Sequence, residues 1–280
     1  MIFQVTNGCS WNKCSFCDMY TQPQKKFRAR SEEEVLAEIR NAAAAGPRFE
    51  KVFLADGDAL VLPVRRLENI LIQIRESLPW VKRVGAYCLP RNIRKKSTTE
   101  LARLRELGLG IAYVGAESGD DDVLKAISKG ETYASTLDAL LKLQSAGITT
   151  SVMVLNGMGG RELSSQHAVN SARLMNEAQP DFLSTLIVSF PLGASRVEQG
   201  FKDSGYQFEL PDQHELFVEL RQFISELDLS STVFRSDHAS NYLPLKGTLG
   251  QDKAALLSQL DTAIVKPDAI RLRQEWQRGL

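Results

Sequence analysis

Short runs of β-branched and apolar residues alternate with amphipathic stretches over the first two thirds of the chain. The runs have the length of buried strands, and the stretches have the 3.6-residue apolar period of helices. Strands are predicted at residues 3–6, 52–55, 81–87, 111–115, 150–155 and 182–188. Helices are predicted at residues 31–45, 64–78, 97–107, 121–127, 134–146, 162–178 and 212–226. Six βα units predict an α/β fold whose parallel sheet has right-handed crossovers and is flat or curled into an incomplete barrel.

The alternation weakens after about residue 195, where no further βα unit is evident. A polar segment at 230–250 is followed by a basic stretch that we expect to form a terminal helix. We therefore expect one compact unit, with a barrel core at 1–195 and a C-terminal helix and capping segment at 196–280.

Composition excludes several classes of protein. The 280 residues include 34 Lys and Arg against 34 Asp and Glu, so no overall basic field exists to attract nucleic acid or a membrane surface. No apolar run reaches the length of about 18 residues that a membrane span needs, and the first residues do not resemble a signal peptide. We expect a cytoplasmic protein, in which cysteines serve metal binding or catalysis more often than disulfides.

Residue types that can bind metals or ligands or take part in catalysis gather after the predicted strands. In parallel α/β folds, ligands bind at the carboxyl ends of the strands. Five of the six loops at these positions hold a glycine, a cysteine or a carboxylate, whereas the strands themselves are plain. The six loops are the cysteine loop after residue 6 and the segments 56–58, 88–91, 115–119, 156–160 and 189–191.

The first of these loops carries Cys9, Cys14 and Cys17 within nine residues. Thiolates bind zinc and iron–sulfur clusters, but a structural zinc site needs four ligands, and the fourth cysteine, Cys88, is distant in sequence. Three thiolates suit a [4Fe–4S] cluster with one iron open to chemistry. Zinc and thiols without a metal remain the alternatives at this point.

The segment from Asn7 to Cys17 resembles the signature loop of the radical S-adenosylmethionine (SAM) superfamily. Phe16 matches the aromatic residue that precedes the last cysteine of that loop. The first two cysteines are separated by four residues here, one more than is usual in the family.

Three later segments extend the resemblance over about residues 3–195. Residues 53–60 are similar to the family's Gly-Gly-Glu segment, with Asp58 where glutamate is usual. Residues 115–119 resemble the fourth-strand segment of the oxygen-independent coproporphyrinogen oxidase and Elongator-type branches, and residues 156–160 fall where the family contacts adenine. Taken singly, each segment also has a structural explanation. Asp56 and Asp58 fit helix-capping acids, residues 115–119 fit an ordinary βα turn, and residues 156–160 fit a loop at a helix start whose glycines allow a wider range of backbone conformations.

The resemblance implies a (β/α)6 partial TIM barrel with a short C-terminal cap. It implies one [4Fe–4S] cluster and SAM as cofactors, an external electron donor of the flavodoxin or ferredoxin type, and a small-molecule substrate. The cluster ligands would be Cys9, Cys14 and Cys17. The SAM contacts would be Asp56, Gly57 and Asp58 to the ammonium, Glu117 and Ser118 to the ribose or methionyl groups, and the backbone of Phe16, Gly157 and Met158 to adenine.

The implied reaction is reductive cleavage of SAM to a 5′-deoxyadenosyl radical, which abstracts hydrogen from substrate. With one cysteine remaining after three are used, no auxiliary cluster can be built from cysteine alone. The alternatives are an RNA-modifying enzyme of the same superfamily, which the neutral charge disfavours, and a non-catalytic protein that binds the cluster or SAM.

Three further side chains are candidates for contact with substrate. Cys88 follows the third predicted strand, and His238 and Tyr242 lie in the polar segment near the C-terminus. The alternatives are a buried apolar role for Cys88 and a surface loop that docks the last helix. We expect His167 and His214 to be surface residues and the basic run at 271–278 to be a solvated helix face, with an RNA contact as the alternative.

Overall fold

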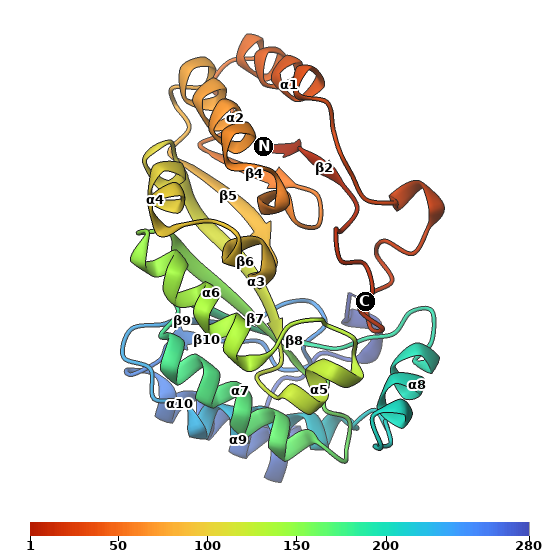
Figure 1. Cartoon of the computed structure of the whole chain (residues 1–280). Coiled ribbons are helices and arrows are strands. Elements are labelled where there is room, and N and C mark those ends of the chain that lie inside the picture. Colours follow the sequence, from red (N-terminus) through yellow and green to blue (C-terminus); the bar gives the residue numbers. More distant parts are fainter. Residues whose placement is uncertain (280) are drawn as a thin grey trace. The chain divides into compact units, whose positions relative to one another are not determined.

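The computed structural model describes residues 1–279 (Figure 1). Its strands are β1 Ile2–Gln4, β2 Thr6–Asn7, β3 Arg28–Ala29, β4 Lys51–Ala55, β5 Arg83–Cys88, β6 Leu109–Glu117, β7 Thr149–Asn156, β8 Phe182–Ile187, β9 Val233–Ser236 and β10 Leu245–Thr248. Its α-helices are α1 Glu32–Ala44, α2 Val64–Ser77, α3 Pro90–Arg94, α4 Thr98–Glu106, α5 Asp121–Ala126, α6 Tyr133–Ser145, α7 Ser164–Ala178, α8 Ser195–Asp203, α9 Gln213–Glu226 and α10 Lys253–Val265.

The chain divides into two compact units. The first comprises Met1–Asn12, Met19–Gly115 and Asp138–Ser151, and the second comprises Lys13–Asp18, Ala116–Leu137 and Val152–Leu280. The cysteine loop crosses this division, because Cys9 belongs to the first unit and Cys14 and Cys17 belong to the second.

In the first unit, β1, β4, β5 and β6 follow one another in the sheet, and each neighbouring pair is parallel. Helices α1, α2 and α4 lie along one face of these strands (Figure 1). Side chains alternate along β4, where Val52 and Leu54 are buried and Phe53 is half-buried. Helix α1 begins as predicted, because the Ser31 hydroxyl and the Glu34 carboxylate cap each other's backbone amides.

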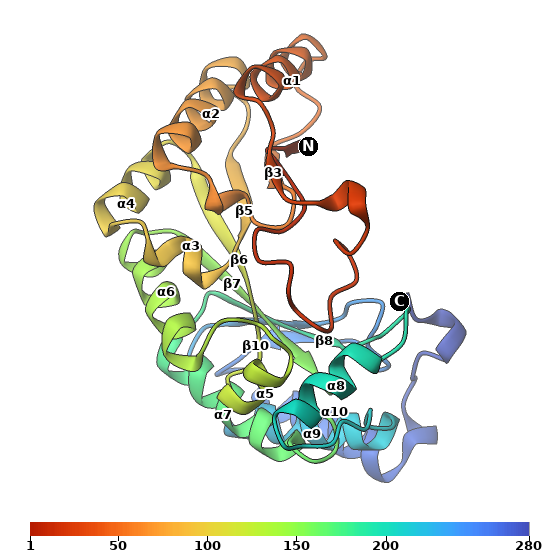
Figure 2. The ribbon, with the colours of Figure 1, turned by 45° about the vertical axis from the view of Figure 1, so that its right-hand side comes forward.

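In the second unit, β9 lies parallel to β8, and β10 is antiparallel to β9. Helix α9 packs between α7 and α10, and α5 packs against α8 (Figure 2). A buried apolar cluster lies among the loops and helices that follow β6, β7 and β8. Its members include Val123, Leu124, Ile127, Leu155, Met158, Val188, Val197, Phe201 and Phe208.

The fold-class prediction is confirmed: the structure is α/β with a mostly parallel central sheet, consistent with a partial barrel. The six predicted strands are present, with ends shifted by one or two residues. Strands β9 and β10 and helix α8 were not among the predictions. A helix follows the polar segment as expected, α10 at Lys253–Val265, but the prediction that the basic run at 271–278 is helical is wrong, because it contains only a short 3-10 turn at Glu275–Gln277.

Within residues 1–279, no helix is both long enough and apolar enough to cross a lipid bilayer.

Candidate functional site

Asp58 holds the arm of the cysteine loop that carries Cys9. The Asp58 carboxylate is fully buried and accepts hydrogen bonds from the backbone amide of Ser10, at 3.2 Å, and from the Ser10 hydroxyl. The Asn92 side-chain amide donates, at 3.5 Å, to the same Asp58 oxygen that accepts the Ser10 hydroxyl. Burial raises the pKa of the Asp58 carboxyl above its usual value, and the hydrogen bonds from Ser10 and Asn92 oppose this rise. Asp58 thus fixes the residue directly after Cys9.

Asp56 and Gly57 lie beside the same arm. Asp56 accepts hydrogen bonds from the Gly8 amide at 3.3 Å and the Tyr20 hydroxyl at 3.0 Å, and Lys25 lies 3.8 Å away. The Gly57 amide donates to the Gly8 carbonyl at 3.2 Å. A Cβ at Gly57 would lie 2.9 Å from the Tyr20 ring, so a larger residue here would have to displace that ring. The two predicted SAM contacts therefore also support the backbone that leads into Cys9.

Arg196 of α8 holds the arm that carries Cys14 and Cys17. Its guanidinium donates to the Cys14 carbonyl at 2.8 Å and to the Cys17 carbonyl at 3.2 Å, and it pairs with Asp18 at 3.1 Å. The Cys17 amide also donates to the Cys14 carbonyl, at 3.4 Å, which closes a turn between the two cysteines. A planar fork with several donors is suited to bridging carbonyls in this way. Sequence reasoning missed Arg196, because it is far from the cysteines along the chain.

Phe16 and Met158 belong to the same apolar region of the second unit. Phe16 packs against the apolar cluster to which the fully buried Met158 belongs. The Ser15 amide donates to the Ile127 carbonyl at 2.9 Å, which anchors the loop on the segment after α5. The structure thus brings together two residues that were predicted to frame adenine.

Glu117 ends β6 in a left-handed backbone conformation, with φ of 64°. Such a conformation is uncommon for a non-glycine residue and is frequent at functional sites. The Glu117 carboxylate forms an ion pair with Lys129 at 2.8 Å, and the side chains are only 10% and 4% exposed respectively. Lys129 falls in the segment that resembles the family, but sequence reasoning gave it no role. The pair sets where the Glu117 carboxylate lies.

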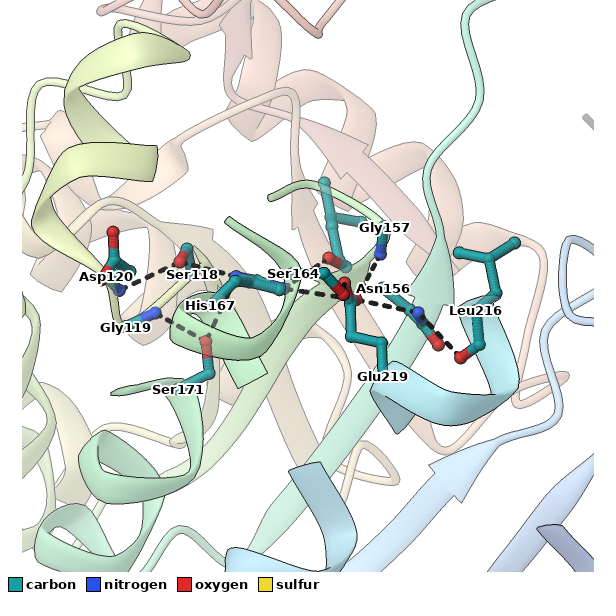
Figure 3. Close-up of polar contacts among 11 residues, drawn as sticks. Ser118, Gly119, Asp120, Asn156, Gly157, Ser164, His167, Ser171, Leu216 and Glu219 are labelled. Atoms are coloured by element: carbon teal, nitrogen blue, oxygen red, sulfur yellow. Dashed lines mark hydrogen bonds and ion pairs between the residues drawn. The ribbon is translucent and has the colours of Figure 1, made fainter. Parts of the chain in front are cut away.

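Ser118 faces the protein interior. Its hydroxyl is fully buried, lies 2.8 Å from Nδ1 of His167, and accepts the Asp120 amide at 3.0 Å (Figure 3). His167 was predicted to be a surface residue, and this is wrong because its side chain is only 2% exposed. The exposed position predicted for His214 is confirmed.

The three candidate substrate contacts differ in their surroundings. Cys88 is 2% exposed and lies on the buried face of β5 with Val84 and Ala86, in agreement with the apolar alternative. His238 is exposed, and its Nδ1 accepts the backbone amide of Ser240 at 3.1 Å.

Tyr242 is held by the C-terminal tail. Its hydroxyl donates to Glu275, and the Arg278 guanidinium lies 3.9 Å from the centroid of its ring. Burial and the Glu275 hydrogen bond raise the pKa of Tyr242 to about 12, so the phenol stays protonated at neutral pH. Arg273 donates to the carbonyls of His238 and Asn241. The basic run therefore binds backbone carbonyls of this chain rather than forming a solvated helix face.

The donor chemistry of the cysteine loop fits an iron–sulfur cluster with three protein ligands. Cys9, Cys14 and Cys17 are half-buried and are not joined by disulfides. Within residues 1–279, no three His, Cys, Asp or Glu side chains are already gathered as a metal site. Thiolate ligands on one short loop are typical of cluster-binding proteins.

Comparison with known proteins gives a consistent result. A family model of the Radical SAM superfamily matches residues 3–175. A hopanoid C-3 methylase from Methylococcus capsulatus is 24% identical over 153 residues, or 54% of this chain and 28% of the methylase. The ribosomal protein uS12 methylthiotransferase RimO from Clostridium botulinum is 25% identical over 169 residues, or 56% of this chain and 36% of RimO. The chain thus spans about a third of the length of these relatives.

Solved structures support the same fold. Coproporphyrinogen III oxidase (HemN) from Escherichia coli has a TM-score of 0.59 and 15% identity, covering 80% of this chain and 51% of its own. The methyltransferase TsrM from Kitasatospora setae has a TM-score of 0.57 and 16% identity, covering 94% of this chain and 61% of its own, in a structure with a [4Fe–4S] cluster and cobalamin bound. The matched superfamily uses a [4Fe–4S] cluster and SAM.

Proposed function

This chain belongs to the radical SAM superfamily, and from that membership we propose that it is an enzyme that cleaves SAM reductively, with Cys9, Cys14 and Cys17 as cluster ligands. A [4Fe–4S] cluster held by these three cysteines would supply the electron for reductive cleavage of SAM to methionine and a 5′-deoxyadenosyl radical, and that radical would take a hydrogen atom from substrate. A flavodoxin or ferredoxin type of donor supplies the electron. Similar proteins are named as a methylase, a methylthiotransferase and an oxidase. We therefore propose only the cleavage of SAM and leave the reaction on the substrate unassigned.

The strongest support for this proposal is that hydrogen bonds hold the backbone of both arms of the cysteine loop. Asp58 fixes the backbone next to Cys9, and Arg196 binds the carbonyls of Cys14 and Cys17. Backbone that is held in place beside the ligands of each unit restrains the thiols of that unit, as a metal centre requires.

The remaining residues are assigned around SAM. Asp56 has a carboxylate that is partly exposed and can accept hydrogen bonds from the ammonium group. Glu117 is held by Lys129 and is assigned to the ribose or methionyl groups. The Ser118 hydroxyl is already engaged with His167, so Ser118 is assigned through its backbone. The backbone of Phe16, Gly157 and Met158 is assigned to adenine.

A small organic substrate is favoured over RNA. Lys and Arg equal Asp and Glu in number, so the chain carries no net charge to attract a polyanion. His238 and Tyr242 remain the proposed substrate contacts, and both lie on the segment that Arg273 and Glu275 hold in place.

Replacing Cys9, Cys14 or Cys17 singly by alanine is expected to abolish cluster binding, because two thiolates do not hold a [4Fe–4S] cluster. The measurement is iron and sulfide content after anaerobic reconstitution, followed by reduction with dithionite in the presence of SAM and assay of 5′-deoxyadenosine. Cys88→Ala is the matched control and is expected to bind about four irons per chain, like the parent.

Two outcomes would contradict the proposal. A full cluster in the Cys9, Cys14 or Cys17 variants would disprove the ligand assignment. A cluster in the parent that binds SAM without producing 5′-deoxyadenosine would instead support a non-catalytic protein.

Arg196→Gln is expected to make the cluster more labile, with about fivefold faster loss to a chelator. The change removes the charged donor from two loop carbonyls, and partly exposed hydrogen bonds contribute about 1 kcal/mol together. The measurement is the rate at which the absorbance of the cluster decays in anaerobic EDTA. Lys202→Gln removes the same charge from an exposed position of α8 and should leave the rate unchanged. Equal rates for the two variants would show that Arg196 does not support the loop.

A further inference from the structure

A buried carboxylate from α9 meets the turn that follows β7. Glu219 is only 3% exposed. One of its oxygens accepts the Gly157 amide at 2.6 Å and the Asn156 side-chain amide at 2.9 Å, and the other accepts the Ser164 hydroxyl at 2.6 Å (Figure 3). Hydrogen bonds to an ionised acceptor are stronger than those between neutral groups. One carboxylate therefore joins the end of β7 and the start of α7 to α9.

The turn at Gly157 is packed closely against α9. Gly157 has φ of +87°, and an added Cβ would lie 2.8 Å from the Leu216 side chain of α9. The Asn156 side chain also donates to the Leu216 carbonyl at 3.3 Å. The turn is thus packed directly on α9 and hydrogen-bonded to it.

His167 lies between the end of β7 and the segment after β6. Its Nε2 lies 3.0 Å from the Leu155 carbonyl and 3.8 Å from the Glu219 carboxylate. Nδ1 of the same ring lies 2.8 Å from the Ser118 hydroxyl. The Ser118 oxygen in turn accepts the Asp120 amide. His167 is thus hydrogen-bonded to the end of β7 and to Ser118, and it lies beside the Glu219 carboxylate at a distance too long for a hydrogen bond.

The segment after β6 is also packed tightly on α7. The Gly119 amide donates to the Ser171 hydroxyl at 2.8 Å. A Cβ at Gly119 would lie 2.4 Å from the Asn170 carbonyl oxygen, which is closer than any side chain can approach. Helix α7 is therefore hydrogen-bonded to Glu219 at Ser164 and is also in direct contact with the segment after β6.

We propose that Glu219 is a positioning residue for SAM: it fixes the Gly157 turn directly and, through Ser164, the helix α7 on which the Ser118–Asp120 segment packs. This inference rests on the proposed function, which assigns both segments to SAM. Glu219 lies outside residues 3–175, which match the family model, so it is a determinant of SAM binding that this protein supplies from its C-terminal part.

The test compares Glu219→Gln with Glu226→Gln, which removes the same charge from an exposed position of the same helix. Glutamine keeps the shape of Glu219 and loses its charge. SAM affinity, measured by anaerobic equilibrium dialysis on protein of equal iron content, is expected to fall about tenfold in Glu219→Gln. The rate of 5′-deoxyadenosine formation at saturating SAM is expected to stay within about twofold of the parent rate.

A second readout uses cluster-free protein. Amide hydrogen exchange in the peptides that contain Gly157 and Gly119 is expected to become about fivefold faster in Glu219→Gln and to stay unchanged in Glu226→Gln. Unchanged SAM affinity and unchanged exchange in folded Glu219→Gln would overturn the inference. Should Glu219→Gln fail to fold, Ser164→Ala removes one of the three donors and is expected to weaken SAM binding about threefold; unchanged affinity there would overturn the inference equally.

Failure of the proposed function would look different. In that case the folded parent protein with its cluster would itself bind no SAM, or bind it without cleavage. Normal binding by the parent together with normal binding by Glu219→Gln disproves only the role of Glu219.

Discussion

Gly8→Ala is expected to destabilise the protein by about 2–5 kcal/mol and to prevent cluster incorporation. Gly8 has φ of +72°, and an added Cβ would lie 2.1 Å from the Lys25 carbonyl oxygen and 3.2 Å from the Phe27 amide nitrogen. These are backbone atoms, so they cannot swing aside as a flexible side chain would. The backbone that leads into Cys9 must therefore move, and its hydrogen bonds with Asp56 and Gly57 are lost.

Gly46→Ala separates the two causes of that loss. Gly46 follows α1 with φ of +79°, but among residues 1–279 no atom outside its chain neighbours lies within 4 Å of the added Cβ. It should cost only the conformational penalty of about 1 kcal/mol and should leave iron content intact. Urea unfolding and iron content measure both variants. Equal destabilisation by the two would refute the steric explanation for Gly8.

Lys129→Met is expected to lower the free energy of unfolding by about 3–5 kcal/mol. The substitution leaves the buried Glu117 carboxylate without its cation, and an unpaired buried charge is costly. The double variant Lys129→Met/Glu117→Gln is expected to recover most of this loss, because no charge then remains unpaired. Thermal and urea unfolding measure the effect.

The pair formed by Lys82 and Glu50 provides the control. Its two charged atoms are 2.7 Å apart, close to the 2.8 Å of the buried pair, but its side chains are 71% and 61% exposed. Lys82→Met should therefore change stability by at most about 1 kcal/mol. A similar cost at Lys129 and Lys82 would mean that burial does not govern the Glu117 pair.

Local signals in the sequence were sufficient to predict most strands of the sheet and to single out the cysteine loop. The capping box of Ser31 and Glu34 depends on neighbours three residues apart, and apolar runs mark the strands. Strands β9 and β10 carry no such signal, because they are short and lie in a polar segment. Their pairing with β8 and with each other forms them, and pairing between distant segments is not visible in local patterns.

The partners of the site residues were harder to predict than the residues themselves. His167 had a usable signal, since it lies four and eight residues before Ser171 and Met175 on the buried face of α7. Arg196 and Glu219 had none, because each acts on a loop more than 60 residues away, and a single charged residue in a helix normally faces solvent. Distance along the chain hid these contacts.

The position of Glu219 bears on how a shortened version of this protein could be made. A fragment cut where the family match ends, at residue 175, or where the predicted core ends, at residue 195, would keep Gly157 and Ser164 but lose the carboxylate that accepts their hydrogen bonds. The buried amide of Gly157 would then have no acceptor from α9. A minimal working fragment should therefore extend beyond Glu226, so that its boundary follows the hydrogen bonds of the fold rather than the end of recognisable sequence similarity.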